Sequence, residues 1–346
     1  MPESPISPPA ATETMSAVVY RRPGPIEPAD SLVDARVPVP TLGPHDLLVQ
    51  VMAVSVNPVD VKQRANAAPR GDGILGYDAA GVVAAIGPSV TLFAPGDEVF
   101  YAGSITRPGA NAEFQAVDER VVGRKPVTLG FAEAAALPLT SITAWEGLLK
   151  QLRLSRDSRG TLLVIGAAGG VGSMVVQLAK VVTGVTVVAT ASRPETVEWV
   201  RALGADHVID HSRDLLPQLA EVAPDGVDAV FSTQRTKQNL PMLVEALKPF
   251  GHIVAIDDPD ELDVRPLKPK ALSFHWEYMF ARSMFGTPDL VEQHRLLDSV
   301  AELVESGAVR TTLTRVLTPF DAATLREAHR LVESGTTIGK VVVSRV

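Results

Sequence analysis

Four glycines lie close together in this chain, at Gly166, Gly169, Gly170 and Gly172. The stretch 161–165 before them is a short apolar run rich in residues that favour β-strands. After them, apolar residues recur at the spacing of one helix face. A glycine turn between a buried strand and a helix lets backbone N–H groups approach a phosphate at the positive end of that helix. The pattern therefore predicts a dinucleotide-binding turn.

The glycines depart by one residue from the strict G-x-G-x-x-G register, because Ala167 stands at the first position and Gly166 precedes it. Glycines in a loop usually mean only a turn, but here the strand and the helix that the motif requires are both predicted. The residues expected to contact the cofactor at this turn are Gly166, Ala168, Gly169, Gly170, Val171 and Gly172.

The end of the next predicted strand bears on which dinucleotide is bound. In NAD binders an acidic residue about 20 positions after the glycine turn bonds the ribose 2′-hydroxyl. Here the strand ends without an acid before Glu195, and Ser192 and Arg193 offer a hydroxyl and a cation to a 2′-phosphate instead. His211, after the following strand, could cover the same phosphate. We therefore expect NADPH; a solvated Arg193 at a helix start would leave the missing acid unexplained.

Three further residues follow predicted strands of the same sheet, namely Ser232, Ile256 and Asp257. Ligands of such sheets bind outside the carboxyl ends of the strands. These three residues are therefore expected to contact the cofactor as well.

The composition limits the function classes. The chain has 346 residues, of which 46% are hydrophobic and 21% charged, so two globular domains are expected. A net charge of −8 argues against nucleic acid or an anionic membrane as the main partner. The absence of cysteine excludes disulfides, cysteine-ligated zinc, iron–sulfur clusters and a thiol nucleophile.

The first 14 residues are rich in Pro, Ser and Thr and lack both the basic and the apolar region of a signal peptide. We expect a disordered tail over residues 1–14 and a cytoplasmic protein. No apolar run approaches the length that a membrane span needs.

The rest of the chain changes character along its length. Up to about residue 120 it reads as short strands bounded by turns, with no long helix. A helical stretch over 131–149 is interrupted at Pro138, and a late helix is predicted to start at Thr287. From Thr161 strands and helices alternate, which predicts a doubly wound parallel sheet. The last strand, over 339–344, is expected to return to the first domain.

Together these features resemble the medium-chain dehydrogenase/reductase superfamily, and within it the quinone oxidoreductase (zeta-crystallin-like) branch. The resemblance covers residues from about 15 to 346. The segments that carry it are 54–60 (VSVNPVD), 75–83 (LGYDAAGVV), 96–99 (GDEV), 134–145 (AAALPLTSITAW), 167–172 (AAGGVG) and 338–341 (IGKV). The segments 103–109 and 273–280 are similar to a subgroup often labelled zinc-type alcohol dehydrogenase-like.

The resemblance implies an α/β chain with a GroES-like β-rich domain, residues 15–138 and 286–346, and a Rossmann domain, residues 139–285. It implies an active site between the two domains and a homodimer. Thr140 and Thr143, on the helix between the domains, are then expected to approach the nicotinamide or the diphosphate.

The zinc-type label does not fit the residues. Catalytic zinc in the alcohol dehydrogenase branch needs a Cys, a His and a second Cys. The resemblance matches these positions to Asn57, Tyr77 and, approximately, Leu139, none of which is a usual zinc ligand. Asp60 and Asp78 stand at acidic positions, but two carboxylates alone make a poor zinc site. The sequence therefore predicts no metal.

Without a Lewis acid, an activated acceptor such as a quinone or an α,β-unsaturated carbonyl is easier to reduce than a simple ketone. Hydrogen-bond donors near the acceptor oxygen would stabilise the developing negative charge. Asn57 and Tyr77 are the candidate catalytic donors. The alternatives are that Asn57 sets a turn before a proline and that Tyr77 only lines the pocket. Asp60 is expected to hold the domain together or to orient Asn57.

An aromatic and methionine cluster follows the last Rossmann strands, at Trp276, Met279, Phe280, Met284 and Phe285. The resemblance implies that it edges the substrate pocket and a subunit contact; ordinary core is the alternative. The function expected is NADPH-dependent, zinc-independent reduction of a quinone or enone. A carbonyl reductase or alcohol dehydrogenase without zinc, and a low-turnover NADPH-binding protein, are the competing hypotheses.

Overall fold

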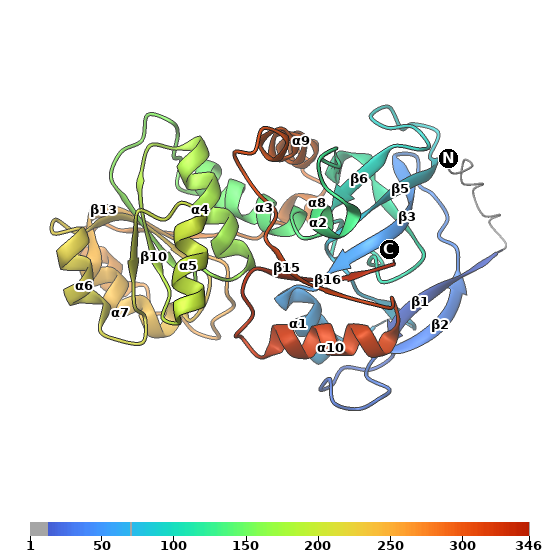
Figure 1. Cartoon of the computed structure of the whole chain (residues 1–346), viewed down its shortest axis with the longest axis horizontal. Helices are drawn as coiled ribbons and strands as arrows, with labels where there is room; N and C mark the ends of the chain where they lie inside the picture. Colours follow the sequence, from blue (N-terminus) through green and yellow to red (C-terminus); the bar gives the residue numbers. More distant parts are fainter. Residues whose placement is uncertain (1–12, 70, 346) are drawn as a thin grey trace. The chain divides into compact units, whose positions relative to one another are not determined.

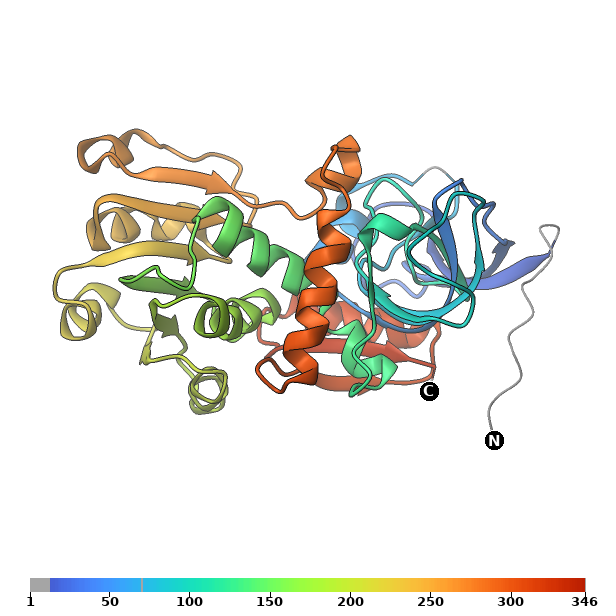
Figure 2. The same ribbon diagram turned by 90° about the horizontal axis from the view of Figure 1, so that it is seen from above.

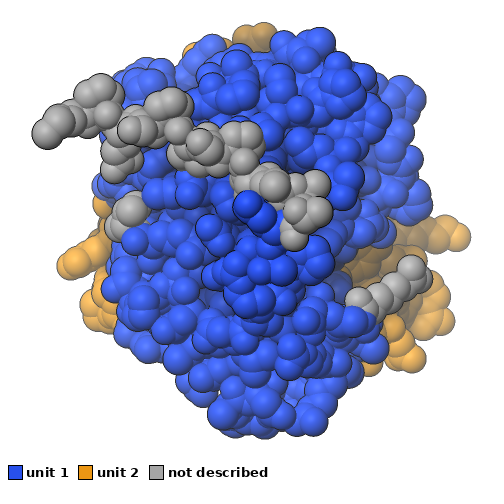
Figure 3. Space-filling model, turned by 90° about the vertical axis from the view of Figure 1, so that its right-hand side faces the viewer, with its two compact units in different colours: residues 1–139, 280–346 blue, residues 140–279 orange. Residues whose placement is uncertain are grey.

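The computed structural model describes residues 13–69 and 71–345. The chain divides into two compact units, which Figure 3 colours separately: unit 1 is formed by residues up to 139 and from 280 onward, and unit 2 by Thr140–Met279. Most of the predicted tail, residues 1–12, lies outside the described residues. Thr14 does not belong to such a tail, because it begins the first strand and pairs with Pro38.

Unit 1 is rich in strands from both ends of the chain. Its strands are β1 (Thr14–Tyr20), β2 (Val33–Pro38), β3 (Asp46–Ser55), β4 (Gly73–Ile74), β5 (Ala79–Ile86), β6 (Glu98–Tyr101), β7 (Phe114–Asp118), β8 (Val122–Arg124), β15 (Leu313–Leu317) and β16 (Lys340–Ser344). Its helices are α1 (Pro58–Asn66), η1 (Glu119–Val121), α2 (Phe131–Ala135), α8 (Ala281–Phe285), α9 (Glu292–Glu305) and α10 (Ala322–Glu333). The β-rich domain predicted for this part is confirmed.

Strand β3 organises the larger sheet of unit 1, which runs β15-β16-β3-β5-β6-β8 with β7 also paired to β3. Most residues of β3 are apolar, and the strand is buried along almost its whole length. The late strand β16 pairs antiparallel with it, Val343 opposite Val54, so the predicted return of the chain to its first domain is confirmed. Figure 1 shows this red strand beside the blue N-terminal strands.

Helix α1 interrupts the strands of the first 120 residues. Asn57 precedes it, Pro58 occupies its first position and Asp60 closes a capping box onto Asn57. These residue types at this spacing are a helix-start signature. The helix therefore begins at the segment that carries the candidate catalytic asparagine.

Unit 2 contains a six-stranded parallel sheet over residues 161–276, in the order β11-β10-β9-β12-β13-β14. Its strands are β9 (Thr161–Ile165), β10 (Thr186–Thr190), β11 (His207–Ile209), β12 (Val227–Ser232), β13 (Leu247–Ala255) and β14 (Ser273–Trp276). Its helices are η2 (Glu146–Gln151, a π-helix), α4 (Gly170–Val182), α5 (Pro194–Ala202), α6 (Leu215–Val222), α7 (Thr236–Ala246) and η3 (Arg265–Lys270), while α3 (Pro138–Trp145) spans the unit boundary.

From β9 the chain adds β10 and β11 on one side of the sheet, and it then returns to add β12, β13 and β14 on the other side. This is the doubly wound arrangement. Right-handed crossovers then place α4 and α5 on one face of the sheet and α7 on the other. A buried apolar cluster joins the α6–α7 face to the strands, with Leu163, Val188 and Val230 opposite Leu219 and Leu243. The predicted Rossmann fold is confirmed, and Figure 2 shows its strands and helices from above.

The helical stretch over 131–149 is interrupted before Pro138, as predicted, and comprises α2, α3 and the π-helix η2. One helix prediction needs correction. The late helix α9 begins at Glu292 rather than at Thr287. There the carboxylate of Asp289 accepts hydrogen bonds from the Thr287 hydroxyl at 2.6 Å and from Arg282 Nε at 3.1 Å, which forms a turn before the helix. Within the described residues, no helix is both long and apolar enough to cross a membrane.

Candidate active site

The glycine turn of unit 2 has the geometry that a phosphate cradle requires. Gly166 follows β9 with a φ of +73°, and a Cβ there would lie 2.3 Å from the Thr233 hydroxyl, so only glycine fits. The N–H of Gly169 donates to the carbonyl of Gly166 at 3.2 Å and closes the turn. Helix α4 begins at the next residue. The first N–H groups of a helix have no partners within it and attract an anion.

Close packing of α4 onto the turn explains a further glycine. A Cβ on Gly172 would lie 2.3 Å from the carbonyl oxygen of Gly166 and 2.6 Å from Cα of Ala167. Gly169 differs, because its Cβ would meet only the Gly166 carbonyl oxygen, at 3.5 Å. The first turn of α4 thus packs closely against Gly166 and Ala167 at Gly172, whereas the space around Gly169 is open. These residues fit a dinucleotide phosphate.

The next strand is fixed to this turn by a side chain that the sequence analysis did not single out. The N–H of Gly166 donates to the hydroxyl of Thr190 at 3.0 Å, and Thr190 is fully buried at the end of β10. Ser192 and Arg193 follow directly after this anchor. A threonine at the last position of a buried strand is the only sequence signal that marks it.

The structure brings two of the predicted 2′-phosphate residues together. The hydroxyl of Ser192 lies 3.2 Å from Nε2 of His211, which follows the neighbouring strand β11. Arg193 precedes α5 and its Nε lies 3.3 Å from the carboxylate of Glu195, with both side chains about half exposed. Such an exposed ion pair contributes about 0–1 kcal/mol, so it does not prevent Arg193 from binding a phosphate.

The other strand ends have structural partners. The hydroxyl of Ser232 lies 2.7 Å from that of Thr236, and the N–H of Ile256 donates to the Ser232 carbonyl at 3.2 Å. Asp257 accepts from the N–H of Thr236 at 2.8 Å and from its hydroxyl. The carboxylate therefore caps α7. Contact of Ser232, Ile256 and Asp257 with a cofactor stays a prediction.

Thr140 and Thr143 lie three residues apart on α3 and therefore on one side of it. Both are buried. Their approach to a cofactor stays a prediction.

In unit 1, Asp60 ties α1 to the turn before Tyr77. One carboxylate oxygen accepts from the N–H of Asn57 at 2.8 Å, and the other accepts from the N–H of Gly76 at 2.8 Å. Burial raises the pKa of Asp60 to about 6, against the lowering effect of these two N–H groups and of the Lys340 ammonium. Asp60 holds the domain together and positions Asn57, as expected.

The amide of Asn57 is engaged within the protein. Its Nδ2 donates to the carbonyl of Ser55 at 3.2 Å and to Oδ2 of Asp78 at 3.0 Å. Its Oδ1 accepts from the ammonium of Lys340. An amide has two N–H donors, and both are used here. In this arrangement Asn57 positions its neighbours, and its contact with a substrate stays a prediction.

Lys340, which sequence analysis did not assign a role, completes this arrangement. Its Nζ lies 3.1 Å from Oδ2 of Asp78, and the two side chains are 4% and 0% exposed. Asp78 also accepts from the N–H of Leu139 at 2.9 Å. Burial raises the pKa of Asp78, and the Lys340 ammonium opposes that rise. We call Asn57, Asp78 and Lys340 the Lys340 cluster; its one sequence signal is a lysine opening an apolar strand.

The residues at the positions matched to zinc ligands do not fit a catalytic zinc. An amide, a phenol and an aliphatic side chain stand at Asn57, Tyr77 and Leu139, where a zinc site needs Cys and His. The carboxylate of Asp78 already has an ammonium, an amide and a backbone N–H as partners. Among residues 13–69 and 71–345, no group of three or more His, Cys, Asp or Glu could hold a metal ion.

Tyr77 directly precedes Asp78 of the Lys340 cluster in the sequence. Its ring is buried and packs edge-on against the ring of Phe280, with the two ring centroids 5.5 Å apart. Phe280 belongs to the predicted aromatic and methionine cluster, which the structure divides. Met279 and Phe280 are buried, whereas Trp276 and Phe285 are 50% and 78% exposed. Ordinary core is therefore wrong for Trp276, Met284 and Phe285, which are all exposed.

The chain matches known proteins over most of its length. Residues 43–145 match the alcohol dehydrogenase GroES-like domain, and residues 203–343 match the zinc-binding dehydrogenase family. A zinc-type alcohol dehydrogenase-like protein of Staphylococcus aureus is 43% identical over 310 residues, 88% of this chain and 92% of that protein. The chloroplastic NADPH-dependent alkenal/one oxidoreductase of Arabidopsis thaliana is 32% identical, covering 90% of this chain and 75% of that protein.

Solved structures agree with these matches. A Rhizobium etli protein, provisionally assigned as a zinc-dependent alcohol dehydrogenase, has 53% identity and a TM-score of 0.93 over 96% of this chain and 98% of its own. The quinone oxidoreductase of Coxiella burnetii has 26% identity and a TM-score of 0.77, over 96% and 99%. The chain therefore belongs to the medium-chain dehydrogenase/reductase superfamily of oxidoreductases, beside the zinc-type alcohol dehydrogenase-like proteins.

Proposed function

We propose that this oxidoreductase uses NADPH to reduce a quinone or an α,β-unsaturated carbonyl compound without zinc. The observation that carries the proposal is the Lys340 cluster. Its buried ammonium lies between Asp78 and Asn57, and Asn57 stands at one of the positions that the family resemblance matches to zinc ligands. Acceptors that need no Lewis acid are the ones this chemistry suits. The alkenal/one oxidoreductase relative supports the same substrate class.

The residues of unit 2 that would hold NADPH are those of the glycine turn and of the strand end beside it. Backbone N–H groups from Gly170 to Gly172 would bind the diphosphate at the start of α4, beside Gly169. Ser192, His211 and Arg193 would bind the 2′-phosphate with a hydroxyl, an imidazole and a guanidinium. When bound, NADPH supplies a hydride.

The residues of unit 1 would act on the acceptor. We assign to Tyr77 the hydrogen bond to the acceptor oxygen, because its phenol O–H can stabilise the negative charge that develops there. The Lys340 cluster and Asp60 act through Tyr77 by fixing the segment 76–78. Tyr77 is thus the proposed catalytic residue, and Asn57, Asp60, Asp78 and Lys340 are positioning residues.

NADPH oxidation with three acceptors tests the reaction. We expect turnover with 9,10-phenanthrenequinone and with a simple enone, little with an unactivated ketone, and no change after treatment with a chelator. Activity that falls with chelator and returns with zinc contradicts the metal-free proposal. Preferred reduction of the ketone favours a carbonyl reductase, and NADPH binding without turnover favours a binding protein.

Two substitutions separate the cofactor proposal from the catalytic one. Arg193→Glu should shift preference from NADPH toward NADH by raising KM for NADPH, because a carboxylate repels the 2′-phosphate and can accept from a 2′-hydroxyl. Tyr77→Phe should lower kcat while leaving NADPH affinity unchanged. An enzyme that already prefers NADH contradicts the assignment of Ser192 and Arg193. The homodimer also stays a prediction, which light scattering after size-exclusion chromatography tests.

A further inference from the structure

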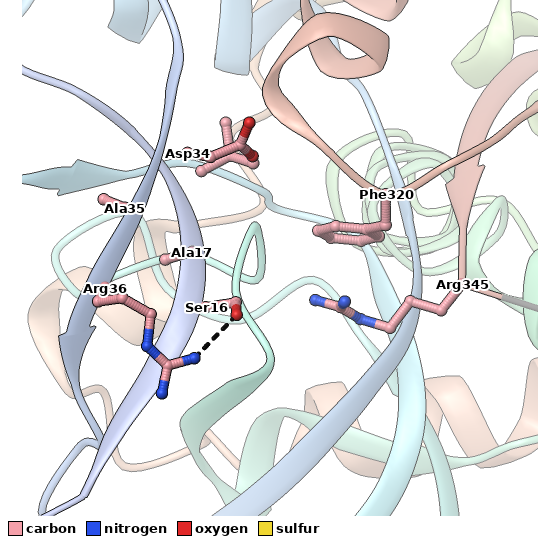
Figure 4. A pocket seen from close by; sticks show the side chains of 8 residues that line it. Ser16, Ala17, Asp34, Ala35, Arg36, Phe320 and Arg345 are labelled. Carbon is pink, nitrogen blue, oxygen red and sulfur yellow. Dashed lines mark hydrogen bonds between the residues drawn. The ribbon is translucent and has the colours of Figure 1, made fainter.

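A pocket of unit 1 lies apart from every residue assigned above. It is formed by the β1–β2 hairpin, the segment before α10 and the residue after β16, and has a volume of about 470 Å³. That size is sufficient for a small organic molecule. Figure 4 shows Phe320 and Arg345 on one side of the pocket and Ser16, Asp34 and Arg36 on the other.

Arg345 is held in place by neutral groups. Its Nε donates to the carbonyl of Val51 on β3 at 2.9 Å, and its guanidinium carbon lies 4.0 Å from the centre of the Phe320 ring. The guanidinium then points toward the hairpin (Figure 4). Among the described residues it has no ion-pair partner. Burial lowers the pKa of Arg345, and the carboxylate of Glu113 opposes that effect only in part.

Arg36 faces the same pocket and is also bonded only to neutral oxygens. Its guanidinium donates to the hydroxyl of Ser16 at 3.0 Å and to the hydroxyl and carbonyl of Thr14. No carboxylate of the described chain forms an ion pair with it. The pocket therefore presents two guanidinium groups whose charge is not neutralised by direct contact.

The two carboxylates nearby are committed to backbone groups. Asp34 accepts from the N–H of Ala322 at 3.0 Å and so caps the start of α10. Glu113 accepts from the N–H of Ser16 at 3.2 Å. Neither carboxylate is placed to neutralise the guanidinium groups by a direct bond. An anion that enters the pocket would meet unsatisfied charge-assisted donors.

We propose that this pocket binds a small planar organic carboxylate. The carboxylate accepts hydrogen bonds from the terminal nitrogens of Arg345, with Arg36 adding a second positive charge from the hairpin. The flat apolar part of the ligand packs beside Phe320 and against the hairpin. The Lys340 cluster and Tyr77 do not line this pocket, so the site is additional to the proposed reductase site.

Benzoate is a suitable probe, with benzamide as its neutral counterpart of the same shape. Isothermal titration of the full-length protein should show saturable binding of one benzoate per chain in the millimolar range, and binding of benzamide at least tenfold weaker. Arg345→Gln should weaken benzoate binding at least tenfold. Arg22→Gln is the matched control, because Arg22 is exposed and paired with Asp30 outside the pocket, and it should leave the affinity unchanged.

A second variant keeps the test decisive if Arg345→Gln fails to fold. Arg36→Gln removes the second guanidinium from the exposed face of the hairpin and leaves Arg345 and the buried core unchanged, so it should weaken benzoate binding severalfold. Equal affinity of benzoate and benzamide, the absence of saturable binding, or wild-type affinity in a folded Arg36→Gln variant would each overturn the proposal. Retained affinity in a folded Arg345→Gln variant would overturn it as well.

Discussion

At the scale of single residues, we expect the loss of the Lys340 side chain to destabilise unit 1 strongly. Its ammonium is buried with the carboxylate of Asp78, 3.1 Å away. Lys340→Met would leave that carboxylate buried without a counterion, which costs about 3–5 kcal/mol in the free energy of unfolding. Denaturant unfolding followed by circular dichroism measures the loss. Catalytic activity should fall with it, because Tyr77 adjoins Asp78 in the chain.

Lys237→Met is the matched control for this prediction. Lys237 pairs with Asp260 at 2.9 Å, but the two side chains are 42% and 83% exposed. Its removal should change the free energy of unfolding by about 0–1 kcal/mol. The double variant Asp78→Asn with Lys340→Met should be more stable than Lys340→Met alone, because it removes the unpaired charge. Equal losses for Lys340→Met and Lys237→Met would contradict a buried ion pair.

At the scale of elements, α10 carries a histidine that links stability to pH. His329 is fully buried, and neither ring nitrogen has a hydrogen-bond partner among the described residues. Burial, together with the nearby Arg64 guanidinium on α1, lowers the pKa of His329 from 6.5 to about 3. The unfolded chain therefore binds a proton below pH 6.5 that the folded chain does not. Stability from this group is complete above pH 6.5 and is lost as the pH falls toward 3.

His329→Leu should remove this dependence. Between pH of about 4 and about 6, the free energy of unfolding of the variant should fall less steeply, by about 1.4 kcal/mol per pH unit. Above pH 7 the two curves should run parallel. Denaturant titrations across this range measure both slopes. Identical slopes on the acid side would show that His329 does not stay neutral in the folded protein.

The contact of α4 with the glycine turn gives a second prediction at this scale. Gly172→Ala would place a Cβ 2.3 Å from the carbonyl oxygen of Gly166, so backbone must move. We expect a loss of about 1–3 kcal/mol in the stability of the ligand-free protein, measured by its unfolding temperature. Gly169→Ala meets nothing closer than 3.5 Å and should cost less, about 0.5–1 kcal/mol, because Ala is a poorer N-cap residue than Gly. Similar effects of the two substitutions would show that the turn is not tightly packed.

The elements of unit 2 were predictable because each signal is local. A β-strand, four glycines and an amphipathic helix follow one another within about 20 residues, so the turn could be located without the fold. The sequence alone also indicated that the residues at the zinc-related positions are not zinc ligands, since this depends only on residue types. The Lys340 cluster could not be predicted, because Lys340 and Asn57 are separated by 283 positions and meet only through the pairing of β16 with β3.

Two features of the site were not visible in the sequence. The sequence context of Asn57 does not show that Ser55 and Asp78 accept both amide hydrogens. For Trp276, Met284 and Phe285 the sequence left both a pocket edge and ordinary core open, because exposure depends on what packs against each residue. Hydrophobicity predicts burial better than it predicts which apolar residues remain on the surface.

At the scale of the whole molecule, the two units differ in whether they are formed by one segment of the chain or by two. Unit 2 is one continuous segment, Thr140–Met279, whereas unit 1 needs residues from both sides of it. An isolated fragment of residues 140–279 should therefore fold, with native-like far-UV circular dichroism and NADPH binding. A fragment of residues 1–139 should not, because it lacks β16 and Lys340.

The control for this prediction joins the two parts of unit 1 directly. A chain of residues 1–139 connected to 280–346 by a flexible linker should regain cooperative unfolding. An unfolded 140–279 fragment would show that unit 2 does not fold independently. A stable 1–139 fragment would show that unit 1 does not need β16 and Lys340.

The pairing of β16 with β3 also has a consequence for synthesis. Ribosomes add about 5–20 residues per second, so roughly 15–60 s pass between the translation of Asn57 and that of Lys340. During that interval unit 2 is completed, although unit 1 began first. Until then, Asp78 lacks the ammonium of Lys340, and β3 lacks its neighbouring strand β16. We expect chaperones to protect this incomplete part of unit 1.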